Sequence, residues 1–208
     1  MRSTQPWPKA RCFAEGAPKL AWAWRLLGDI QFARGDLPAA LQAYEHQQTL
    51  QPSPAKRRIL GVVRFYVGDG KGALDELQAA QVADPDFLYG LIWLDIVKAR
   101  QNVPVPPAYP GQAGVTTEWP DPVLAIFSDA FDPALLLKIA KANPSKPGED
   151  HVGEADFYTA EWNGAHARET DAKTGFAKVV QDCPPRFVET LMAKAELNQT
   201  SPAAAPAR

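Results

Sequence analysis

The sequence has few cysteines, no excess of charge of either sign and no long hydrophobic run. Its 208 residues include two cysteines, and 22 basic residues are balanced by 24 acidic ones. Nucleic acids and anionic membranes bind basic surfaces, so a net charge of −2 argues against both as main partners. No stretch reaches the roughly 20 apolar residues that a transmembrane helix needs. We therefore predict a globular protein without nucleic-acid binding and without an integral membrane segment.

The two cysteines, Cys12 and Cys183, are far apart and lie in no CxxC motif. A structural zinc site needs four clustered nitrogen or sulfur ligands, so this spacing excludes one. A disulfide between them needs a geometry that the sequence does not reveal, and we expect free, unreactive thiols instead.

The N-terminal segment, residues 1–19, lacks the apolar core of a signal peptide because Pro6, Pro8, Glu15 and Pro18 interrupt it. Lys9-Ala10-Arg11 before Cys12 is not a lipobox. As written, the sequence predicts a flexible N-terminal segment and a cytoplasmic protein. A true start further upstream would instead allow a periplasmic or envelope location.

Catalytic and metal-binding motifs are also missing. His151 and Glu154 are three residues apart after Asp150, but a group of acidic residues at a helix start explains these letters better than a metal site. The glycine-rich run at 68–72 lacks the phosphate-loop spacing and reads as a turn between helices. We expect no enzyme, no catalytic residue, no cofactor and no metal.

Proline is abundant, with 20 residues, and it divides the chain into helix-length windows. A proline inside a helix costs about 3 kcal/mol, so helices must begin at or fit between them. The pairs Asp121-Pro122 and Asp132-Pro133 read as an N-cap followed by the first helical residue. Strand signals are weak, apart from an ambiguous 103–105. The predicted fold class is therefore all-α.

Two copies of one pattern occupy residues 21–53 and 54–86. In the second copy each matched position lies 33 residues after its counterpart, as Gly61 follows Gly28 and Pro85 follows Pro52. A third, degenerate copy at 153–185 lies a further 99 residues on. The matched positions are Trp24, Leu27, Gly28, Ala40, Tyr44 and Pro52; Gly61, Ala73 and Pro85; and Ala160, Ala172, Phe176 and Pro184.

These residue types suit pairs of packed helices. Small residues at Gly28, Gly61 and Ala160 would let the second helix of each pair approach the first, while the prolines would end the second helix. The pattern resembles the tetratricopeptide repeat (TPR), whose helical hairpins stack into a solenoid because one hairpin cannot bury its own apolar face.

The remaining segments complete a predicted domain over residues 20–198. Residues 87–100 read as another helix, and residues 102–142 as a non-TPR insert that begins with a proline-rich loop and holds two short helices near 121–130 and 132–142. Residues 185–197 read as an amphipathic capping helix, and 199–208 as a disordered tail.

The second half resembles the NlpI-type bacterial TPR lipoproteins. The resemblance rests on residues 154–158 (EADFY), on the insert around 119–127 (WPDPVLAIF), and on 187–189 and 195–197 near the C-terminus. It implies a helical adaptor in bacterial cell-envelope processes, with a homodimer as a possible state. The missing lipobox leaves membrane anchoring out of this inference.

In a TPR array, five positions of each first helix face a concave groove. Here they are Trp22, Arg25, Asp29, Phe32 and Ala33, then Ala55, Arg58, Val62, Phe65 and Tyr66. Arg25 and Arg58, one repeat apart, could grip an acidic or C-terminal peptide because arginine pairs carboxylates bidentately. An equally favoured alternative packs these residues against an extra N-terminal helix.

We therefore predict a scaffold that binds a partner protein or peptide in this groove. Two alternatives stay open: an obligate subunit of a larger assembly, and a small helical enzyme subunit.

Overall fold

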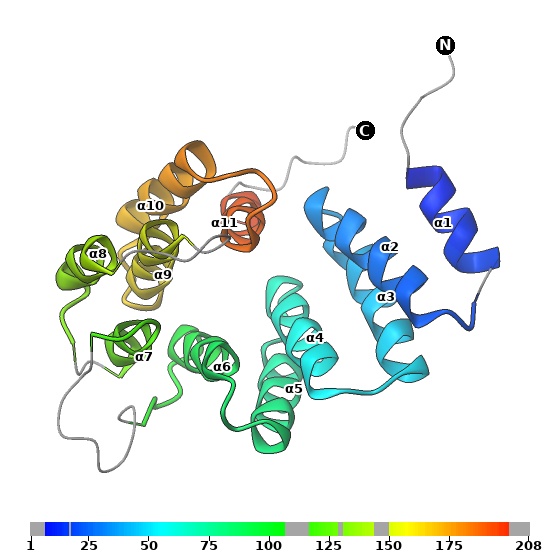
Figure 1. The fold of residues 1–208 in the computed structure, drawn as a ribbon, viewed down its shortest axis with the longest axis horizontal. Coiled ribbons are helices and arrows are strands. Elements are labelled where there is room, and N and C mark those ends of the chain that lie inside the picture. Colours follow the sequence, from blue (N-terminus) through cyan, green and yellow to red (C-terminus); the bar gives the residue numbers. More distant parts are fainter. Residues whose placement is uncertain (1–6, 17, 107–116, 129–130, 144–149, 200–208) are drawn as a thin grey trace, which may run out of the picture. The chain divides into compact units, whose positions relative to one another are not determined.

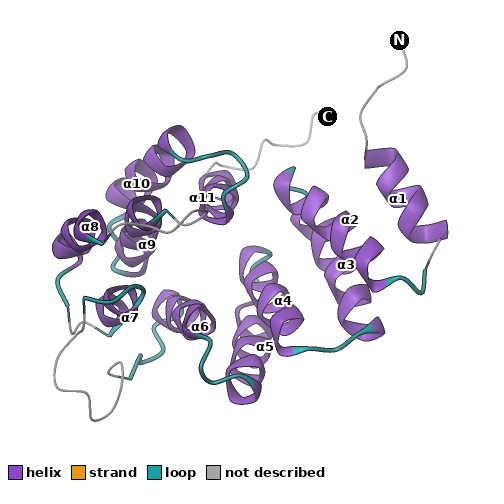
Figure 2. Ribbon diagram, in the orientation of Figure 1, coloured by secondary structure: helices purple, strands orange, loops and turns teal. Residues whose placement is uncertain are grey.

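The computed structural model describes residues 7–16, 18–106, 117–128, 131–143 and 150–199. Within these ranges the chain forms eleven helices and no strand, which confirms the all-α prediction (Figure 2). No helix among the described residues is both long and apolar enough to cross a bilayer. Of the expected tail at 199–208, residue 199 belongs to the last helix, and residues 200–208 lie outside the described ranges, as does most of the proline-rich loop, residues 107–116.

Packing divides the chain into two compact units, residues 1–90 and 91–208. The repeats of a solenoid contact only their neighbours, so such a division does not separate a continuous stack from two domains. The prediction of one helical domain over 20–198 therefore stays a prediction, and each unit is described by itself.

The first unit contains two helical hairpins of the same design (Figure 1). The two helices of each hairpin have the same lengths in both, 13 and then 14 residues, and the second helix ends two residues before Pro52 or Pro85. The hairpins are α2 (Ala21–Ala33) with α3 (Leu37–Leu50), and α4 (Pro54–Tyr66) with α5 (Gly70–Ala83).

Both hairpin turns use a glycine in the left-handed region, Gly35 at φ 77° and Gly68 at φ 85°. The following aspartate donates its N–H to a carbonyl five residues back, Asp36 to Gln31 and Asp69 to Arg64, as in a Schellman motif. The same aspartate then caps the next helix through its carboxylate. The glycine and the aspartate together therefore end one helix and begin the next, which keeps the turn short.

Within each hairpin a glycine of the first helix lies under a large side chain of the second. A Cβ on Gly28 would come within 2.6 Å of the Tyr44 ring, and one on Gly61 within 2.7 Å of Leu77 Cγ. Ala40 and Ala73 are fully buried. The helices are thus close enough that only small residues fit at these crossings.

The predicted flexible segment at the N-terminus contains a helix, α1 (Trp7–Gly16). Its Ala14 is fully buried in a cluster with Ala23, Leu27 and Ala43, and Trp24 packs against the same cluster. Trp24 therefore lies beside α1, whereas Tyr44 packs toward α4. Short side chains at the contact let α1 dock despite its modest length.

Among its described residues, the second unit holds six helices, two of which form a further hairpin. The helices are α6 (Leu88–Arg100, which begins at the unit boundary), α7 (Asp121–Phe127), α8 (Pro133–Ala142), α9 (His151–Ala165), α10 (Glu169–Asp182) and α11 (Val188–Gln199). The α9–α10 turn places Ala167 at φ 56°, with the same backbone bonds as the glycine turns, and α10 ends two residues before Pro184.

Two sequence predictions for this unit are corrected. Asp121 is the first residue of α7, with Pro120 in the cap position, so it does not cap the helix as Asp132 caps α8. The second correction concerns α11, for which an apolar buried face was predicted. Its buried residues instead include Glu189, Thr190 and Glu196 beside Ala193 and Ala195.

Candidate functional site

One side of α2 is exposed along its length. Trp22 and Leu26 are 56% and 46% exposed, and Arg25 and Ala33 are exposed as well. Asp29 on the same side is half-buried. The opposite side of α2 carries its buried residues, among them Ala23, Leu27 and Gln31. We call Trp22, Arg25, Leu26, Asp29 and Ala33 the α2 face.

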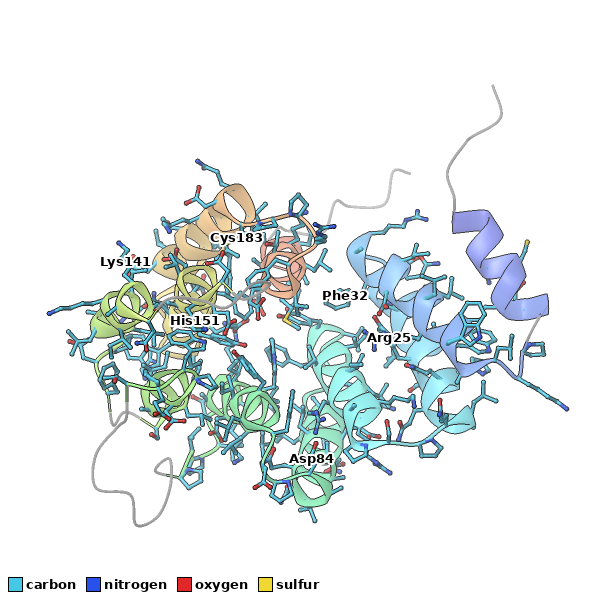
Figure 3. All side chains as sticks on the ribbon, viewed as in Figure 1. Arg25, Phe32, Asp84, Lys141, His151 and Cys183 are labelled. Carbon is cyan, nitrogen blue, oxygen red and sulfur yellow. The ribbon has the colours of Figure 1, made fainter. Side chains whose placement is uncertain are left out.

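A chain of polar contacts ties the α2 face to the neighbouring helix. Nε of Arg25 donates to Oδ1 of Asp29 at 2.6 Å, and the hydroxyl of Tyr44 on α3 donates to the same oxygen at 2.7 Å. Burial, and then the charge of Asp29, raise the pKa of Tyr44 far above its usual value. The phenol therefore stays protonated and keeps Asp29 and Arg25 in place. Figure 3 labels Arg25 and Phe32 on this helix.

The residues of α4 at the positions equivalent to the α2 face have different partners and are less exposed. Nη1 of Arg58 pairs with Oδ2 of Asp84 at 3.0 Å, and its guanidinium lies 4.0 Å from the centre of the Phe87 ring. The Arg58 side chain is only 13% exposed. Val62 and Tyr66 are buried, Phe65 is half-buried, and Ala55 is exposed. Arg58 is thus already paired, which leaves Arg25 as the arginine of this set that solvent reaches well.

The first helices of the two hairpins meet through aromatic side chains. Phe32 of α2 and Tyr66 of α4 lie edge to face, with ring centres 5.8 Å apart, and Phe65 lies beside Tyr66. These three predicted groove residues are therefore brought together. Helix α1 contacts α2 through Ala23 and Leu27, so its packing does not cover the α2 face.

A pocket of about 480 Å³ lies between α1, α2 and α3. Its wall includes Trp24, whose ring stacks on His46 at 4.3 Å, and Gln31, whose buried Oε1 has no hydrogen-bond donor among the described residues. The Arg11–Glu15 ion pair lies at its rim. Sequence reasoning missed this pocket because residues 1–19 were predicted as a flexible segment, and the alternative with an N-terminal helix packed that helix on the groove positions instead of on Ala23 and Leu27.

The second unit buries an unusual number of acidic side chains. Asp95, Glu154, Glu161, Glu189 and Glu196 are all at most 8% exposed. Charged residues are almost never fully buried unless they are paired, so these positions require a partner or a proton. Sequence reasoning missed the cluster, although two of its pairs share a spacing of seven residues: 154 with 161, and 189 with 196.

The start of α9 combines a cap with an aromatic contact. Asp150 accepts from the Gly153 N–H at 2.9 Å, which confirms the expected N-cap, and His151 stacks on Trp119 with ring centres 4.9 Å apart. Trp119 also donates its indole N–H to Oε2 of Glu154 at 2.8 Å. Across the described residues, no three His, Cys, Asp or Glu side chains gather closely enough to hold a metal ion. Figure 3 marks His151 and Cys183 in this unit.

Both cysteines are free thiols, as predicted. Cys183 is buried at the end of α10, and this burial, with nearby Asp150 and Asp156, raises the pKa of its thiol to about 11. The thiolate is the reactive form, so Cys183 is inert at neutral pH.

Comparison of the chain with protein-family models finds no match, and comparison with curated proteins finds none either. The fold and the described surfaces therefore carry the functional argument alone, and they define an all-α protein built largely from helical hairpins.

Proposed function

We propose that this chain is a TPR-type adaptor that docks a segment of a partner protein on the α2 face. The observation that carries the proposal is the exposure of Trp22 and Leu26 one helical turn apart, with Arg25 between them. Tryptophan and arginine dominate the binding energy of protein interfaces, and clustered exposed apolar side chains mark interaction sites.

The chemistry of the face suggests the kind of segment it takes. Trp22 and Leu26 offer an apolar surface, and Arg25 uses Nε for Asp29 while its side chain is 44% exposed. The two Nη groups of a guanidinium can pair a carboxylate bidentately. An apolar side chain followed by a carboxylate, from an acidic residue or a chain end, complements this arrangement.

The TPR assignment is supported by the repeated construction of the hairpins. The 33-residue step joins equivalent helices, equivalent left-handed turns at Gly35 and Gly68, and equivalent close crossings at Gly28 and Gly61. Unrelated hairpins have no reason to share all three. Stacked hairpins of this kind expose the first helix of each pair, which is where the α2 face lies.

The test is affinity capture by the full chain from a lysate of its source organism, with identification of the captured proteins by mass spectrometry. Trp22→Ala and Arg25→Glu should each lower capture of a specific partner about tenfold or more, as expected for interface hot spots. Val82→Ala and Lys71→Glu are matched controls, because Val82 is 80% exposed and the Lys71 side chain 87% exposed on α5. These controls should capture the partner at the wild-type level.

Other outcomes would redirect the assignment. Equal capture by wild type and both α2 variants would place the binding surface elsewhere. A purified chain that captures nothing and instead carries a tightly bound small molecule would contradict the adaptor function and favour an enzyme subunit. A chain that stays soluble only with a stoichiometric partner would favour the obligate-subunit alternative.

A further inference from the structure

The pocket between α1, α2 and α3 contains a buried polar group that lacks a hydrogen-bond donor. Gln31, on the buried side of α2, is 8% exposed and lines the pocket. Its Oε1 accepts from no donor among the described residues. A buried carbonyl oxygen without a donor destabilises a fold, so the pocket favours a ligand that supplies one. We call this space of about 480 Å³ the Gln31 pocket.

The second hairpin shows which chemical group occupies the equivalent place. Arg64 on α4 follows Gln31 by 33 residues, the step that separates all matched positions of the two hairpins. Nη2 of Arg64 donates to Oε1 of Glu45 on α3 at 2.7 Å, and Nη1 donates to Oδ2 of Asp69 at 2.6 Å. In the second hairpin a guanidinium therefore joins the first helix to the helix that precedes it.

The first hairpin keeps the surroundings of this guanidinium but not the guanidinium itself. Asp36 stands 33 residues before Asp69, and each caps the following helix with its carboxylate. Glutamine carries no charge and its side chain ends earlier than that of arginine, so Gln31 does not replace Arg64 as a link to the preceding helix. The Gln31 pocket lies on this side of α2, toward α1.

The charges that line the Gln31 pocket favour a cation. Its lining holds two carboxylates, those of Glu15 and Glu45, and one guanidinium, that of Arg11. Arg11 is engaged by Glu15 at the rim, where both side chains are more than half exposed. Glu45 uses Oε1 for Arg64. An added cation would therefore face more negative than positive charge.

Donors of the lining are used elsewhere. The indole N–H of Trp24 donates to the carbonyl oxygen of Pro18 at 3.1 Å, and the hydroxyl of Thr49 donates to that of Glu45 at 2.9 Å. Neither of these groups is directed at Oε1 of Gln31. A hydrogen bond from a charged donor is stronger than one from a neutral donor, so a cationic N–H group suits this oxygen best.

We propose that the Gln31 pocket binds a guanidinium group from outside the chain, which donates to Oε1 of Gln31 and takes the place that Arg64 holds in the second hairpin. A guanidinium carries five N–H donors and no acceptor, so it can satisfy this oxygen and still face the carboxylates of the lining. Ligand pockets measure about 300–1,000 Å³, and 480 Å³ leaves room for the chain that carries the guanidinium. The group belongs either to an arginine side chain of another protein segment or to a small guanidine.

The direct test is an NMR titration of the ¹⁵N-labelled full chain with N-acetyl-L-arginine N-methylamide. The Trp24 indole N–H and the backbone amides around the Gln31 pocket should shift and saturate, with a Kd on the order of 1 mM for so small a probe. The citrulline analogue has the same shape with a neutral urea and should bind about tenfold or more weakly. Equal binding of both probes, or no saturable shift up to about 20 mM, would overturn the proposal.

A parallel titration with free L-arginine distinguishes the two sources of the group. Binding of the blocked probe at least as tight as that of L-arginine supports an arginine side chain within a protein segment. Binding of L-arginine alone supports a small guanidine with charged ends. Failure of both probes contradicts the guanidinium site itself.

Variants at position 31 test the role of the oxygen. Gln31→Met keeps the length and helix propensity of the side chain and removes Oε1, so binding should weaken about tenfold or more while urea unfolding shows equal or higher stability. Gln31→Arg supplies the chain's own guanidinium and should abolish binding. Gln78→Met, at an exposed position on α5, is the matched control and should bind like wild type.

Two results with Gln31→Met would refute the site. Unchanged binding would show that Oε1 does not contact the probe, and a clear loss of stability would show that the protein itself satisfies this oxygen. Trp22→Ala, on the opposite side of α2, should bind the arginine probe like wild type. The Gln31 pocket and the α2 face can therefore fail independently of each other.

Discussion

The hydroxyl of Tyr44 on α3 donates to the carboxylate oxygen of Asp29 that also accepts from Arg25 on α2, at 2.7 Å and 2.6 Å respectively. The Tyr44 side chain therefore makes two kinds of contact. Its ring covers Gly28 in the hairpin core, and its hydroxyl holds Asp29 on the α2 face. Packing inside the hairpin therefore sets the position of Arg25 on its surface.

Removing only the hydroxyl should loosen the α2 face with little effect on the hairpin. Tyr44→Phe keeps the ring over Gly28 and should lower the free energy of unfolding by about 1 kcal/mol, because Asp29 is partly exposed and water replaces the lost donor. Urea unfolding measures this change. Tyr158→Phe in the second unit is the reference variant, because the loss of its hydroxyl cannot affect Asp29. If the adaptor proposal holds, Tyr44→Phe should also weaken partner capture. An unfolding free energy lowered by 3 kcal/mol or more would mean that the ring packing had changed too.

The close crossing in the second hairpin predicts a strong effect of a single methyl group. Gly61→Ala would place Cβ 2.7 Å from Leu77 Cγ and 3.2 Å from the Ala73 carbonyl oxygen. The gain in helix propensity, about 1 kcal/mol, is smaller than the overpacking cost, so we expect a net loss of about 1–2 kcal/mol in thermal or urea unfolding. Gly16→Ala is the control, because nothing lies within 4 Å of its added Cβ. Equal stability of Gly61→Ala and wild type would show that the helices can separate without cost.

Local features of the fold were accessible from the sequence because they depend on neighbouring residues. Proline fixes where a helix can end, and left-handed glycines such as Gly35 and Gly68 fix where a hairpin turns. Gly28 and Gly61 mark helix crossings, because a residue without a side chain lets two helices approach closely. The all-α class follows from these signals together, without knowledge of the tertiary contacts.

Features that depend on what packs over a residue were not accessible. Val62 and Tyr66 occupy predicted groove positions but are buried, and Arg58 meets Asp84 and Phe87 from outside its own helix. The buried glutamates of α9 and α11 were hidden for a further reason: glutamate on a helix normally faces water. The matching seven-residue spacing could suggest them only once α9 and α11 are known to adjoin.

One turn of the second unit is strained and should be improved by a simple substitution. Ala167 adopts φ 56° between α9 and α10, a conformation that costs a residue with a Cβ roughly 1 kcal/mol, whereas glycine adopts it readily. Ala167→Gly should therefore raise the free energy of unfolding by about 0.5–1 kcal/mol. Ala165→Gly is the matched control. Because residue 165 is helical, glycine there should lower the free energy of unfolding by a comparable amount. If both variants lost stability equally, the turn would not carry the expected strain.

Asp95 predicts a pH dependence of the free energy of unfolding in the weakly acidic range. Asp95 is 3% exposed, and burial, opposed by Lys98, raises the pKa of its carboxyl from 3.8 to about 6. Between these values the folded protein keeps a proton that the unfolded chain has released, so the stability contribution of Asp95 falls as the pH rises and is constant above about pH 6. The size of the fall is about 3 kcal/mol for a shift of this extent. Asp95→Asn cannot titrate and should remove this part of the slope between about pH 4 and pH 6 in urea unfolding, whatever its stability at one pH. Asp86→Asn, at an exposed position, should retain the wild-type slope, and an unchanged slope in Asp95→Asn would show that Asp95 is ionised in the folded protein throughout this range.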